Sequence, residues 1–241
     1  MISVCIATYN GERYLPEQLA SVLASPLVGE VLLSDDGSSD GTCDVVRKFD
    51  DKRVKLLEGP RAGLVKNYGH LLSQARGNQI FLADQDDVWL PEKVQIMSSA
   101  LRSTDLVLSD CVVVDSRLNV LQPSFFASRA SQPGLLRNLA KNSYLGCCMA
   151  FDRRLLAYAL PFPQGLPMHD WWLGLVAETF GTVRFVPTPL VLYRRHGGNA
   201  SSTSAHSTAP LRRQIAWRAR IATELARRWL QHRRSARVAS T

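Results

Sequence analysis

Three aspartates stand within four residues, directly after an apolar run of strand length. The run is 79–83, and the acidic segment that follows contains Asp84, Asp86 and Asp87. Carboxylates this close repel one another unless a cation lies between them. Hard divalent ions take oxygen ligands and keep coordination positions open for substrate phosphates. The segment predicts a Mg²⁺ or Mn²⁺ site. Its alternative is a solvated acidic turn that favours the N-terminus of a helix beginning near Pro91.

Two further polar turns follow strand-like runs nearer the N-terminus, at residues 2–8 and 30–34. The polar residues at these turns are Thr8, Tyr9, Asn10, Asp35 and Asp36. An acidic residue in such a place can accept hydrogen bonds from a base or a ribose, as it does in dinucleotide-binding folds. The alternative is ordinary turn and helix-cap chemistry.

Strand and helix patterns alternate over the first ninety or so residues, which brings the three turns together. Strands are expected at 2–8, 30–34, 54–57 and 79–83, and helices at 16–24, around 45–49 and at 62–76. This alternation predicts a parallel α/β sheet. Ligands of such sheets lie outside the carboxyl ends of the strands, so the polar turns should converge on one site. The chain contains neither GxGxxG nor GxxxxGK[ST], so dinucleotide and Walker-type phosphate binding are not supported.

The second half supplies a candidate base. Strands are expected at 105–109, 111–115 and 189–193, a short helix at 135–139, and an acceptor lid in the polar loop 123–133. A helix then begins at His169, which places Asp170 beside Trp171 and Trp172. Asp170 is the candidate general base, and the two indoles are candidate surfaces for a sugar ring. The alternative makes Asp170 a residue of the helix N-terminus and buries both indoles in the core.

Charge is concentrated at the C-terminal end. Residues 210–241 hold nine arginines and one glutamate, a net charge of +8 that equals the formal charge of the whole chain. The neutral remainder disfavours a nucleic-acid binder. One helical face would carry Leu211, Ile215, Ala222, Leu225 and Trp229, and the opposite face Arg213, Arg220, Arg227 and Arg234. This pattern suits a helix lying on anionic lipid, and its alternative is a helix that packs the apolar stripe on the domain.

Composition sets the remaining bounds. With 241 residues, 46% of them hydrophobic, the chain is long enough for one large α/β domain. No apolar run reaches the roughly 20 residues that span a bilayer, and no basic segment precedes the first strand, so a cytoplasmic protein is expected. Five cysteines without a CxxC pair indicate reduced thiols, with Cys147 and Cys148 as core residues.

Six motifs carry a resemblance to a known family. Three of them resemble, in order and spacing, the family-two glycosyltransferases of GT-A fold: Ala7–Gly11, Asp35–Asp40 and Asp84–Trp89. Three more resemble the bacterial rhamnosyltransferase-like branch that builds surface polysaccharides and lipopolysaccharide: Gly146–Phe151, Met168–Trp172 and Tyr193–Asn199. The resemblance implies a Rossmann-like, mostly parallel sheet flanked by helices over residues 1–200. Beyond the resemblance, composition predicts a linker at 201–209 and a basic amphipathic helix at 210–241.

The resemblance also implies a role for each matching residue on the nucleotide side. Thr8, Tyr9 and Asn10 would line the nucleotide pocket. Asp36 would contact the base or ribose, with Asp35 as the neighbouring alternative. These roles agree with the hydrogen-bonding capacity of the side chains.

On the phosphate side, Asp84 would approach the ribose and Asp86 would ligate Mg²⁺ or Mn²⁺. The register of the acidic segment leaves Asp87 as a second possible ligand. His196 would be an additional metal or pyrophosphate ligand. Lys66 would neutralise phosphate charge, or else be a solvated helix lysine.

The expected activity is that of an inverting, metal-dependent glycosyltransferase. It would move a sugar, rhamnose from dTDP-rhamnose or a hexose from a UDP-sugar, onto a polysaccharide or lipid-linked acceptor. Inversion follows from the family and from the single candidate base. Two alternatives stay open, a Mg²⁺-dependent nucleotidyltransferase and a non-catalytic sugar-nucleotide or polysaccharide-binding module. Peripheral contact with the inner membrane through 210–241 is a further expectation.

Overall fold

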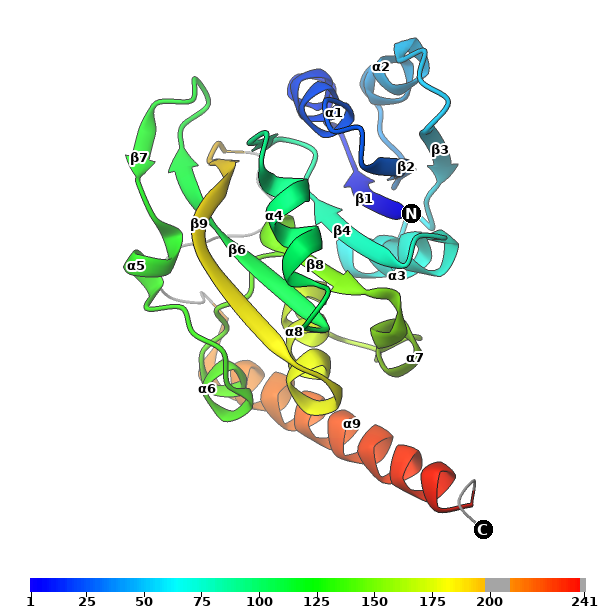
Figure 1. Cartoon of the computed structure of the whole chain (residues 1–241), viewed down its shortest axis with the longest axis vertical. Helices are drawn as coiled ribbons and strands as arrows, with labels where there is room; N and C mark the ends of the chain where they lie inside the picture. The colour runs from blue at the N-terminus through cyan, green and yellow to red at the C-terminus, as the bar shows by residue number, and fades with distance from the viewer. Residues whose placement is uncertain (198–208, 239–241) are drawn as a thin grey trace.

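The computed structural model describes residues 1–197 and 209–238. One curled sheet runs through the molecule, with α4 over its near face and α8 behind it (Figure 1). The order of its hydrogen-bonded strands is β3-β2-β1-β4-β8-β6-β9-β5, and β7 pairs with β6. The predicted α/β class is confirmed.

The first half is the parallel part of the sheet, in which β3, β2, β1 and β4 pair in that order. Its strands are β1 (Ile2–Thr8), β2 (Val28–Asp35), β3 (Val54–Glu58) and β4 (Gln79–Ala83). Its helices are α1 (Leu15–Leu23), α2 (Thr42–Lys48) and α3 (Leu64–Gln74). Every residue of the central strand β1 is buried, as expected of a parallel strand that is covered on both faces. The strands at 2–8 and 79–83 lie where the sequence predicts them.

Helix α1 shows how the local pattern produces this layer. Pro16 stands in the first turn, where its missing N–H costs no intrahelical hydrogen bond. Leu15, Leu19 and Val22 stand at helical spacing and are fully buried. The helix is thereby held against the sheet, and the turn that precedes it stays at the carboxyl end of β1.

Beyond β4 the sheet becomes mixed, because β8 runs antiparallel to both β4 and β6 while β9 runs parallel to β6. The strands of this half are β5 (Val88–Trp89), β6 (Leu106–Val114), β7 (Val120–Gln122), β8 (Met149–Asp152) and β9 (Val183–Arg194). The helices are α4 (Lys93–Ala100), α5 (Phe125–Arg129), α6 (Leu135–Ala140), η1 (Gly146–Cys148), η2 (Arg153–Leu155), α7 (Leu156–Ala159) and α8 (His169–Phe180). The acidic segment therefore leads into β5 before α4 begins.

The two strands expected at 105–109 and 111–115 are a single strand, β6, so that prediction is wrong. Asp110 lies within it, buried, at an irregularity of the pairing with β9. Its carboxylate accepts hydrogen bonds from Ser124 Oγ at 2.5 Å and from the Phe126 N–H at 2.9 Å. Because the loop satisfies this carboxylate, the strand continues through an acidic residue. The loop expected at 123–133 contains α5.

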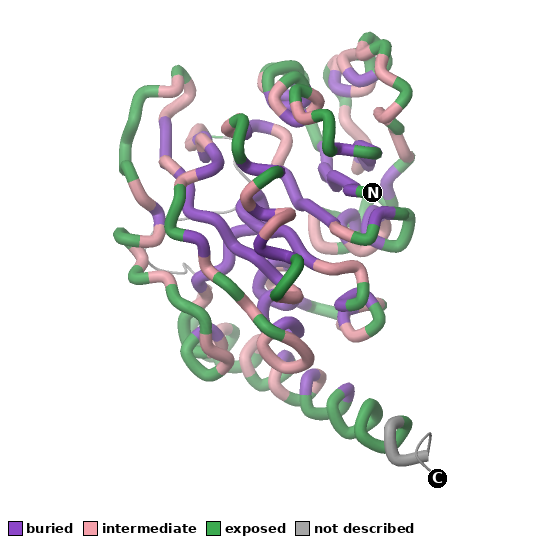
Figure 2. Tube along the Cα trace, in the orientation of Figure 1, coloured by how far each residue is buried: buried purple, intermediate pink, exposed green. Residues whose placement is uncertain are grey.

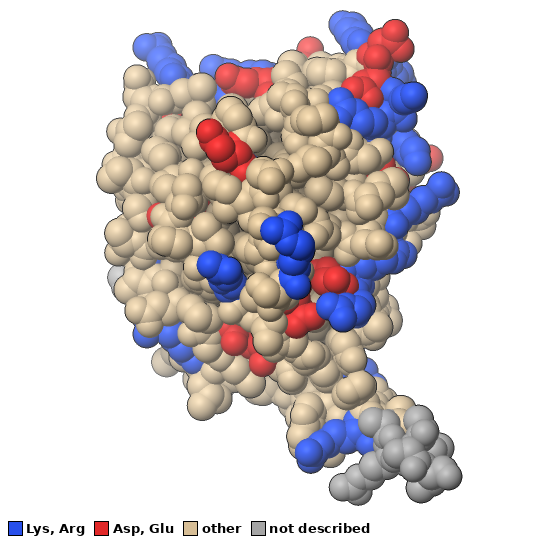
Figure 3. All heavy atoms as spheres, viewed as in Figure 1, with Lys and Arg blue, Asp and Glu red and all other residues tan. Residues whose placement is uncertain are grey.

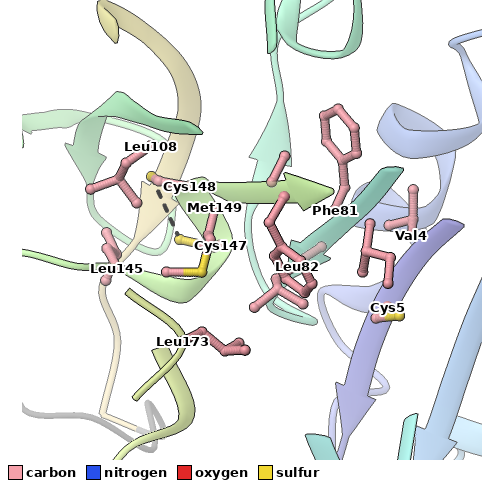
Figure 4. Close-up of a cluster of buried hydrophobic side chains, with 14 of the residues drawn as sticks. Val4, Cys5, Phe81, Leu82, Leu108, Leu145, Cys147, Cys148, Met149 and Leu173 are labelled. Carbon is pink, nitrogen blue, oxygen red and sulfur yellow. Dashed lines mark hydrogen bonds between the residues drawn. The ribbon is translucent and has the colours of Figure 1, made fainter. Parts of the chain in front are cut away.

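The core follows the sheet and the helices behind it (Figure 2). Figure 4 shows Cys147 and Cys148 among its apolar side chains, with their Sγ atoms 3.9 Å apart. All five cysteines are free thiols, and Cys43 alone among them is not fully buried. The expectation of reduced thiols, with the adjacent pair in the core, agrees with this structure.

The C-terminal helix α9 (Leu211–Val238) is present as predicted, and it projects past the sheet at one end (Figure 1). It contacts α6 and α8. Its buried residues are Ile221, Leu225 and Arg228. Three residues of the predicted apolar stripe, Leu211, Ile215 and Trp229, are 71%, 57% and 39% exposed. The stripe is therefore divided, with Leu225 packed on the domain and Leu211, Ile215 and Trp229 exposed.

The packing direction of α9 is set by Arg228. Its guanidinium donates to the backbone carbonyls of Tyr158, Leu160 and Pro161. These bonds turn a neighbouring face of the helix towards the domain. Among the described residues, no helix has the length and apolar character needed to cross a membrane. Residues 201–208 of the expected linker lie outside the described residues. On the face of the molecule seen in Figure 3, acidic and basic side chains are interspersed.

Candidate active site

A pocket of about 470 Å³ opens at the carboxyl ends of β1, β2 and β4, beside the start of α8. Its volume lies in the range of small-molecule sites. Its polar lining residues include Thr8, Tyr9, Asp36, Arg61, Asn67, Asp84, Gln85, Asp86, His169 and Asp170. The predicted convergence of the three polar turns is thus observed, and a carboxylate from the second half of the chain joins them.

Asp35 holds the second turn together. One of its carboxylate oxygens accepts from the N–H groups of Gly37 and Ser38, and the other accepts from the hydroxyls of Ser38 and Thr8. Gly37 has a φ of +95°, which favours glycine at this position. With its oxygens engaged in this way and its side chain buried, Asp35 shapes the turn that carries Asp36.

Asp36 is the member of the pair that lines the pocket. Its carboxylate also accepts from the N–H groups of Ala62 and Gly63, at 3.2 and 2.7 Å, and so connects the second turn to the start of α3. Asn10 serves a similar bridging purpose, because its Oδ1 accepts from the Ser39 N–H at 2.9 Å. These contacts favour Asp36 over Asp35 and Asn10 for the expected role in the nucleotide pocket.

Tyr9 and Gln85 join the first and third turns. The Tyr9 N–H donates to Gln85 Oε1 at 2.9 Å, and Gln85 Nε2 donates to the Tyr9 carbonyl at 3.0 Å. Gly11 makes room for this amide, since a Cβ there would lie 2.3 Å from Gln85 Oε1. Sequence reasoning did not single out Gln85, although its place between two aspartates was a signal for it.

The carboxylates of the acidic segment repel one another. Burial, followed by repulsion from Asp86 and Asp170, raises the pKa of Asp84 to about 8. Tyr68 donates to one oxygen of Asp84 at 3.3 Å, and this bond acts in the opposite direction. Asp86 is buried, and its Oδ2 lies 2.8 Å from His196 Nε2. A divalent cation in the pocket would relieve this repulsion.

Asp87 lies in a different environment from Asp86. It is fully buried, and its Oδ1 accepts from the Arg194 N–H at 2.8 Å. Burial and the neighbouring carboxylates raise its pKa well above the usual range. The buried ammonium of Lys93 lies in the same interior and donates to the Cys147 carbonyl at 3.0 Å. Asp87 therefore connects the acidic segment to the last strand of the chain.

Two groupings of these side chains fit a metal to different degrees. Asp84, Asp87 and Cys147 have potential ligand atoms within 4.8 Å of one another. Burial raises the pKa of the Cys147 thiol, so it stays protonated and is a poor ligand for a hard cation. Asp86 lines the pocket and offers an oxygen, His196 beside it offers a nitrogen, and this pair fits Mg²⁺ or Mn²⁺ better.

Asp170 stands at the start of α8, with only 5% of its surface exposed. Its carboxylate accepts from the Gly146 N–H at 3.1 Å and from the Trp171 N–H at 2.5 Å. Burial raises its pKa to about 6, against the stabilising effect of these two bonds. A carboxylate with this pKa is ionised at neutral pH and is a stronger base than a solvated aspartate.

His169 lines the pocket beside this carboxylate. Its ring stacks on Tyr68 with centroids 3.7 Å apart, and burial lowers its pKa to about 3, so it is neutral at physiological pH. Among the described residues, neither ring nitrogen has a hydrogen-bond partner. Gly146 permits the close packing, since a Cβ there would lie 2.9 Å from His169 Nε2. His169 thus places a neutral imidazole in the pocket wall next to Asp170.

The expected sugar-stacking role of the two indoles does not fit their positions. Trp172 is fully buried, and its Nε1 donates to the Ala159 carbonyl at 3.0 Å. Trp171 is 6% exposed, and its Nε1 donates to the Asn138 carbonyl at 2.7 Å. Both rings pack in the core, because each of the first nine residues of α8 is buried. The alternative stated for them from the sequence is the one observed.

The cations near the pocket differ from those expected. Lys66 is exposed and lines a neighbouring groove rather than the pocket. Arg61, which sequence reasoning missed, lines the pocket itself. Arg194 is buried, where its guanidinium forms an ion pair with Glu17 and donates to the Asp86 carbonyl at 2.7 Å. Arg61 lies in a glycine-bounded turn with no distinctive motif, so only its position in the fold reveals it.

Several curated proteins are similar to this chain. The glucosyltransferase WfgD of Escherichia coli, named for UDP-Glc and α-D-GlcNAc-diphosphoundecaprenol, is 29% identical over 71% of this chain and 68% of its own length. The dTDP-rhamnosyl transferase RfbG of Shigella flexneri is 24% identical over 80% of this chain and 72% of its own.

Solved structures share the fold. TarS of S. aureus (residues 1–349) with UDP-GlcNAc has a TM-score of 0.70 at 22% identity, over 92% of this chain. The mannosyltransferase PcManGT of Pyrobaculum calidifontis, with GDP-Man and Mn²⁺, has a TM-score of 0.59 at 21% identity, over 97% of this chain. The chain spans less than two thirds of each of these solved chains, 66% and 64% respectively.

The family model for glycosyl transferase family 2 matches residues 3–158, which include the three polar turns that meet at the pocket. The structural neighbours are glycosyltransferases of the same curled, mixed-sheet architecture. The chain therefore belongs to glycosyl transferase family 2 and has the GT-A fold.

Proposed function

We propose that this protein is an inverting glycosyltransferase that moves a sugar from a nucleoside diphosphate to a polysaccharide or lipid-linked acceptor, with Asp170 as the general base. The observation that carries the proposal is the place of Asp170. It is a buried carboxylate with a raised pKa, and it lines the same pocket as Asp36, Asp84 and Asp86. A binding module has no need of a buried base held in this way.

In the proposed step, the acceptor hydroxyl oxygen bonds to the anomeric carbon from the side opposite the leaving group. The carbon–oxygen bond to the nucleoside diphosphate breaks, and the leaving oxygen keeps both electrons. The proton of the acceptor hydroxyl passes to Asp170. The N–H groups of Gly146 and Trp171 hold the carboxylate in place. A single base in reach of the acceptor supports inversion.

A divalent cation held by Asp86, with His196 beside it, would neutralise charge on the diphosphate. Asp84 and Asp36 would bind the nucleoside, together with the backbone of Thr8 and Tyr9. Because the pKa of Asp84 is raised to about 8, this carboxyl is largely protonated at neutral pH. A cation in the site would lower its protonated fraction. Asp87 is proposed as a structural carboxylate, because its contacts lie in the interior.

The donor is proposed from the relatives. A dTDP-rhamnosyl transferase and a transferase named for UDP-Glc are both similar to this chain, so dTDP-rhamnose and UDP-hexoses are the first donors to test. A pocket of about 470 Å³ accommodates a nucleotide sugar.

The test is a panel of dTDP-rhamnose, UDP-glucose, UDP-galactose and UDP-N-acetylglucosamine, assayed for binding by calorimetry and for slow hydrolysis with Mn²⁺, Mg²⁺ or EDTA. We expect one donor to be turned over only with the metal, and the turnover to be lost in Asp86→Ala. Asp44→Asn, which changes an exposed carboxylate on α2, is the matched control. A folded protein that binds no donor under any condition would contradict the proposal.

We further propose that α9 brings the enzyme to an anionic membrane surface. Leu211, Ile215, Trp229 and Leu230 are exposed large apolar side chains on this helix. Exposed arginines flank them, and Arg233 lies 4.4 Å from the Trp229 ring. Phosphatidylglycerol vesicles should pellet the wild type more than a Trp229→Ser, Leu230→Ser double variant. Equal pelleting of the two proteins would reject the membrane contact.

A further inference from the structure

Helix α9 lies against α8, the helix that carries Asp170 (Figure 1). The two helices meet through the indoles that follow Asp170 in the chain. The Arg218 guanidinium carbon lies 5.6 Å from the centre of the Trp171 ring. In the same way, the guanidinium carbon of Arg228 lies 5.0 Å from the centre of the Trp172 ring. A guanidinium over an aromatic face is attracted by the quadrupole of the ring, most strongly for tryptophan. Two cations of α9 thus contact the two indoles next to the proposed base.

Trp171 connects this contact to the carboxylate itself. Its backbone N–H donates to Asp170 Oδ1 at 2.5 Å, and its indole N–H donates to the Asn138 carbonyl at 2.7 Å. Arg218 binds close to that point, because its Nη2 donates to the Ala140 carbonyl at 2.7 Å. The indole is therefore fixed by α6 and α9 together. A displacement of this ring would move the N–H that orients Asp170.

The loop 160–168 leads into α8 and is fastened to α9 as well. It has no regular secondary structure, and its prolines at 161, 163 and 167 have no N–H to donate. Arg228 donates to the first two carbonyls of the loop, at 3.3 and 2.6 Å. Arg220 Nη1 donates to the Gln164 carbonyl at 2.9 Å. The segment before the base is thus held by hydrogen bonds from α9.

Gly165 allows Arg220 to approach the loop closely. Its φ is +69°, a conformation that favours glycine, and a Cβ there would clash with Arg220 Nη1. Met168 ends the loop, and His169 and Asp170 follow directly. Helix α9 therefore reaches the carboxylate from two sides, through the loop before it and through the indoles after it.

The burial of Arg228 argues for more than the attachment of α9. Only 9% of its surface is exposed, whereas Ile221 and Leu225 already give the helix an apolar contact with the domain. Its charge is balanced by Glu224, to which its Nε donates at 3.0 Å. Replacing a buried ion pair by apolar residues is often neutral or stabilising, so a guanidinium is a poor choice for anchoring alone. Its planar fork is suited to fixing several acceptors at once, and the acceptors here belong to the segment that leads to Asp170.

We propose that Arg218 and Arg228 are positioning residues for Asp170, so that α9 is part of the structure that holds the proposed base. They act through the two indoles and the loop, since neither of them is among the described residues that line the pocket. This inference rests on the proposed function, because it names the support of the same base. It predicts that replacing either arginine slows turnover and leaves donor binding intact.

The first test is amide hydrogen exchange of the full chain without substrate, read by mass spectrometry. Arg228→Met keeps an unbranched side chain but removes the guanidinium. It should speed exchange about tenfold in peptides that cover 158–173 and leave the peptides of β1 unchanged. Arg234→Met, on an exposed part of α9, is the matched control and should exchange like the wild type. Unchanged exchange at 158–173 in a folded Arg228→Met would overturn the proposal. An increase spread evenly over all peptides would show a loss of global stability alone and would also overturn it.

Turnover of the donor is measured on the same samples without vesicles, so that membrane binding does not contribute. Arg228→Met should lower kcat about tenfold to hundredfold, while the donor Kd from calorimetry should stay within about twofold. Arg218→Met, which changes a half-buried residue, should act in the same direction, and it replaces Arg228→Met in both measurements if that variant does not fold. A wild-type kcat in the folded variant would contradict the positioning role. Failure of the wild type to bind any donor bears only on the transferase reaction, because the exchange at 158–173 is measured without substrate.

Discussion

Replacing Asp170 by asparagine should separate catalysis from binding. The variant keeps the shape of the side chain but cannot take the proton of the acceptor. Loss of a general base typically lowers kcat by about 10²–10⁴-fold. Donor affinity should stay within about twofold, because a base that acts on the acceptor contributes little to donor binding. The measurements are kcat with the donor found in the panel, and donor Kd by calorimetry.

The same variant tests the environment of the carboxylate through stability. The pKa of Asp170 is raised from 3.8 to about 6 by burial, so the folded protein holds this proton more tightly than the unfolded chain does. This contribution to stability is present below about pH 4 and is lost as the pH rises through 6. The difference between these two pKa values corresponds to about 3 kcal/mol of unfolding free energy. Asparagine cannot ionise, so the variant should lack this loss.

The assay is urea unfolding of the wild type, Asp170→Asn and the control Asp44→Asn across this pH range. The wild type and the control should each lose about 3 kcal/mol of unfolding free energy over this pH range that Asp170→Asn does not lose. One of the two N–H donors at Asp170 would face the asparagine amide, at a pH-independent cost of about 1 kcal/mol. Parallel pH curves, or a kcat within about tenfold of the wild type, would refute the assignment. Wild-type turnover itself should rise with pH to a plateau above about 6.

Three further changes follow from the contacts. Asp86→Ala should abolish Mn²⁺-dependent donor turnover, whereas Asp87→Asn should retain the Mn²⁺ affinity measured by calorimetry. If both variants lost Mn²⁺ affinity equally, the metal would belong to the buried cluster of Asp84, Asp87 and Cys147. Trp172→Ala should lower the free energy of unfolding by about 3–5 kcal/mol in urea, because the indole is fully buried. Arg228→Ala should lower the melting temperature, since it removes the hydrogen bonds to 158–161, while the exposed Arg234→Ala should not; equal melting temperatures would show that α9 is anchored in another way.

Local patterns in the sequence were sufficient for the elements of the first half and for the convergence of the polar turns. Apolar runs alternate with amphipathic ones there, and the rule that ligands lie at the carboxyl ends of parallel strands needs no knowledge of side-chain contacts. The second half was less predictable. Its strands pair with partners distant in the chain, and β6 continues through Asp110 only because the loop at 124–126 satisfies that carboxylate.

The sequence by itself thus determined the α/β class, the acidic segment after β4 and the candidacy of Asp170. The tertiary structure decided which of two adjacent residues faces the pocket. Asp36 and Asp86 line it, while Asp35 is enclosed by its own turn and Asp87 accepts from Arg194, more than a hundred residues away. It also buried Trp171 and Trp172 and left Leu211, Ile215 and Trp229 of the predicted α9 stripe exposed. The physical reason is that side-chain direction depends on partners brought together by folding, and sequence spacing does not record them.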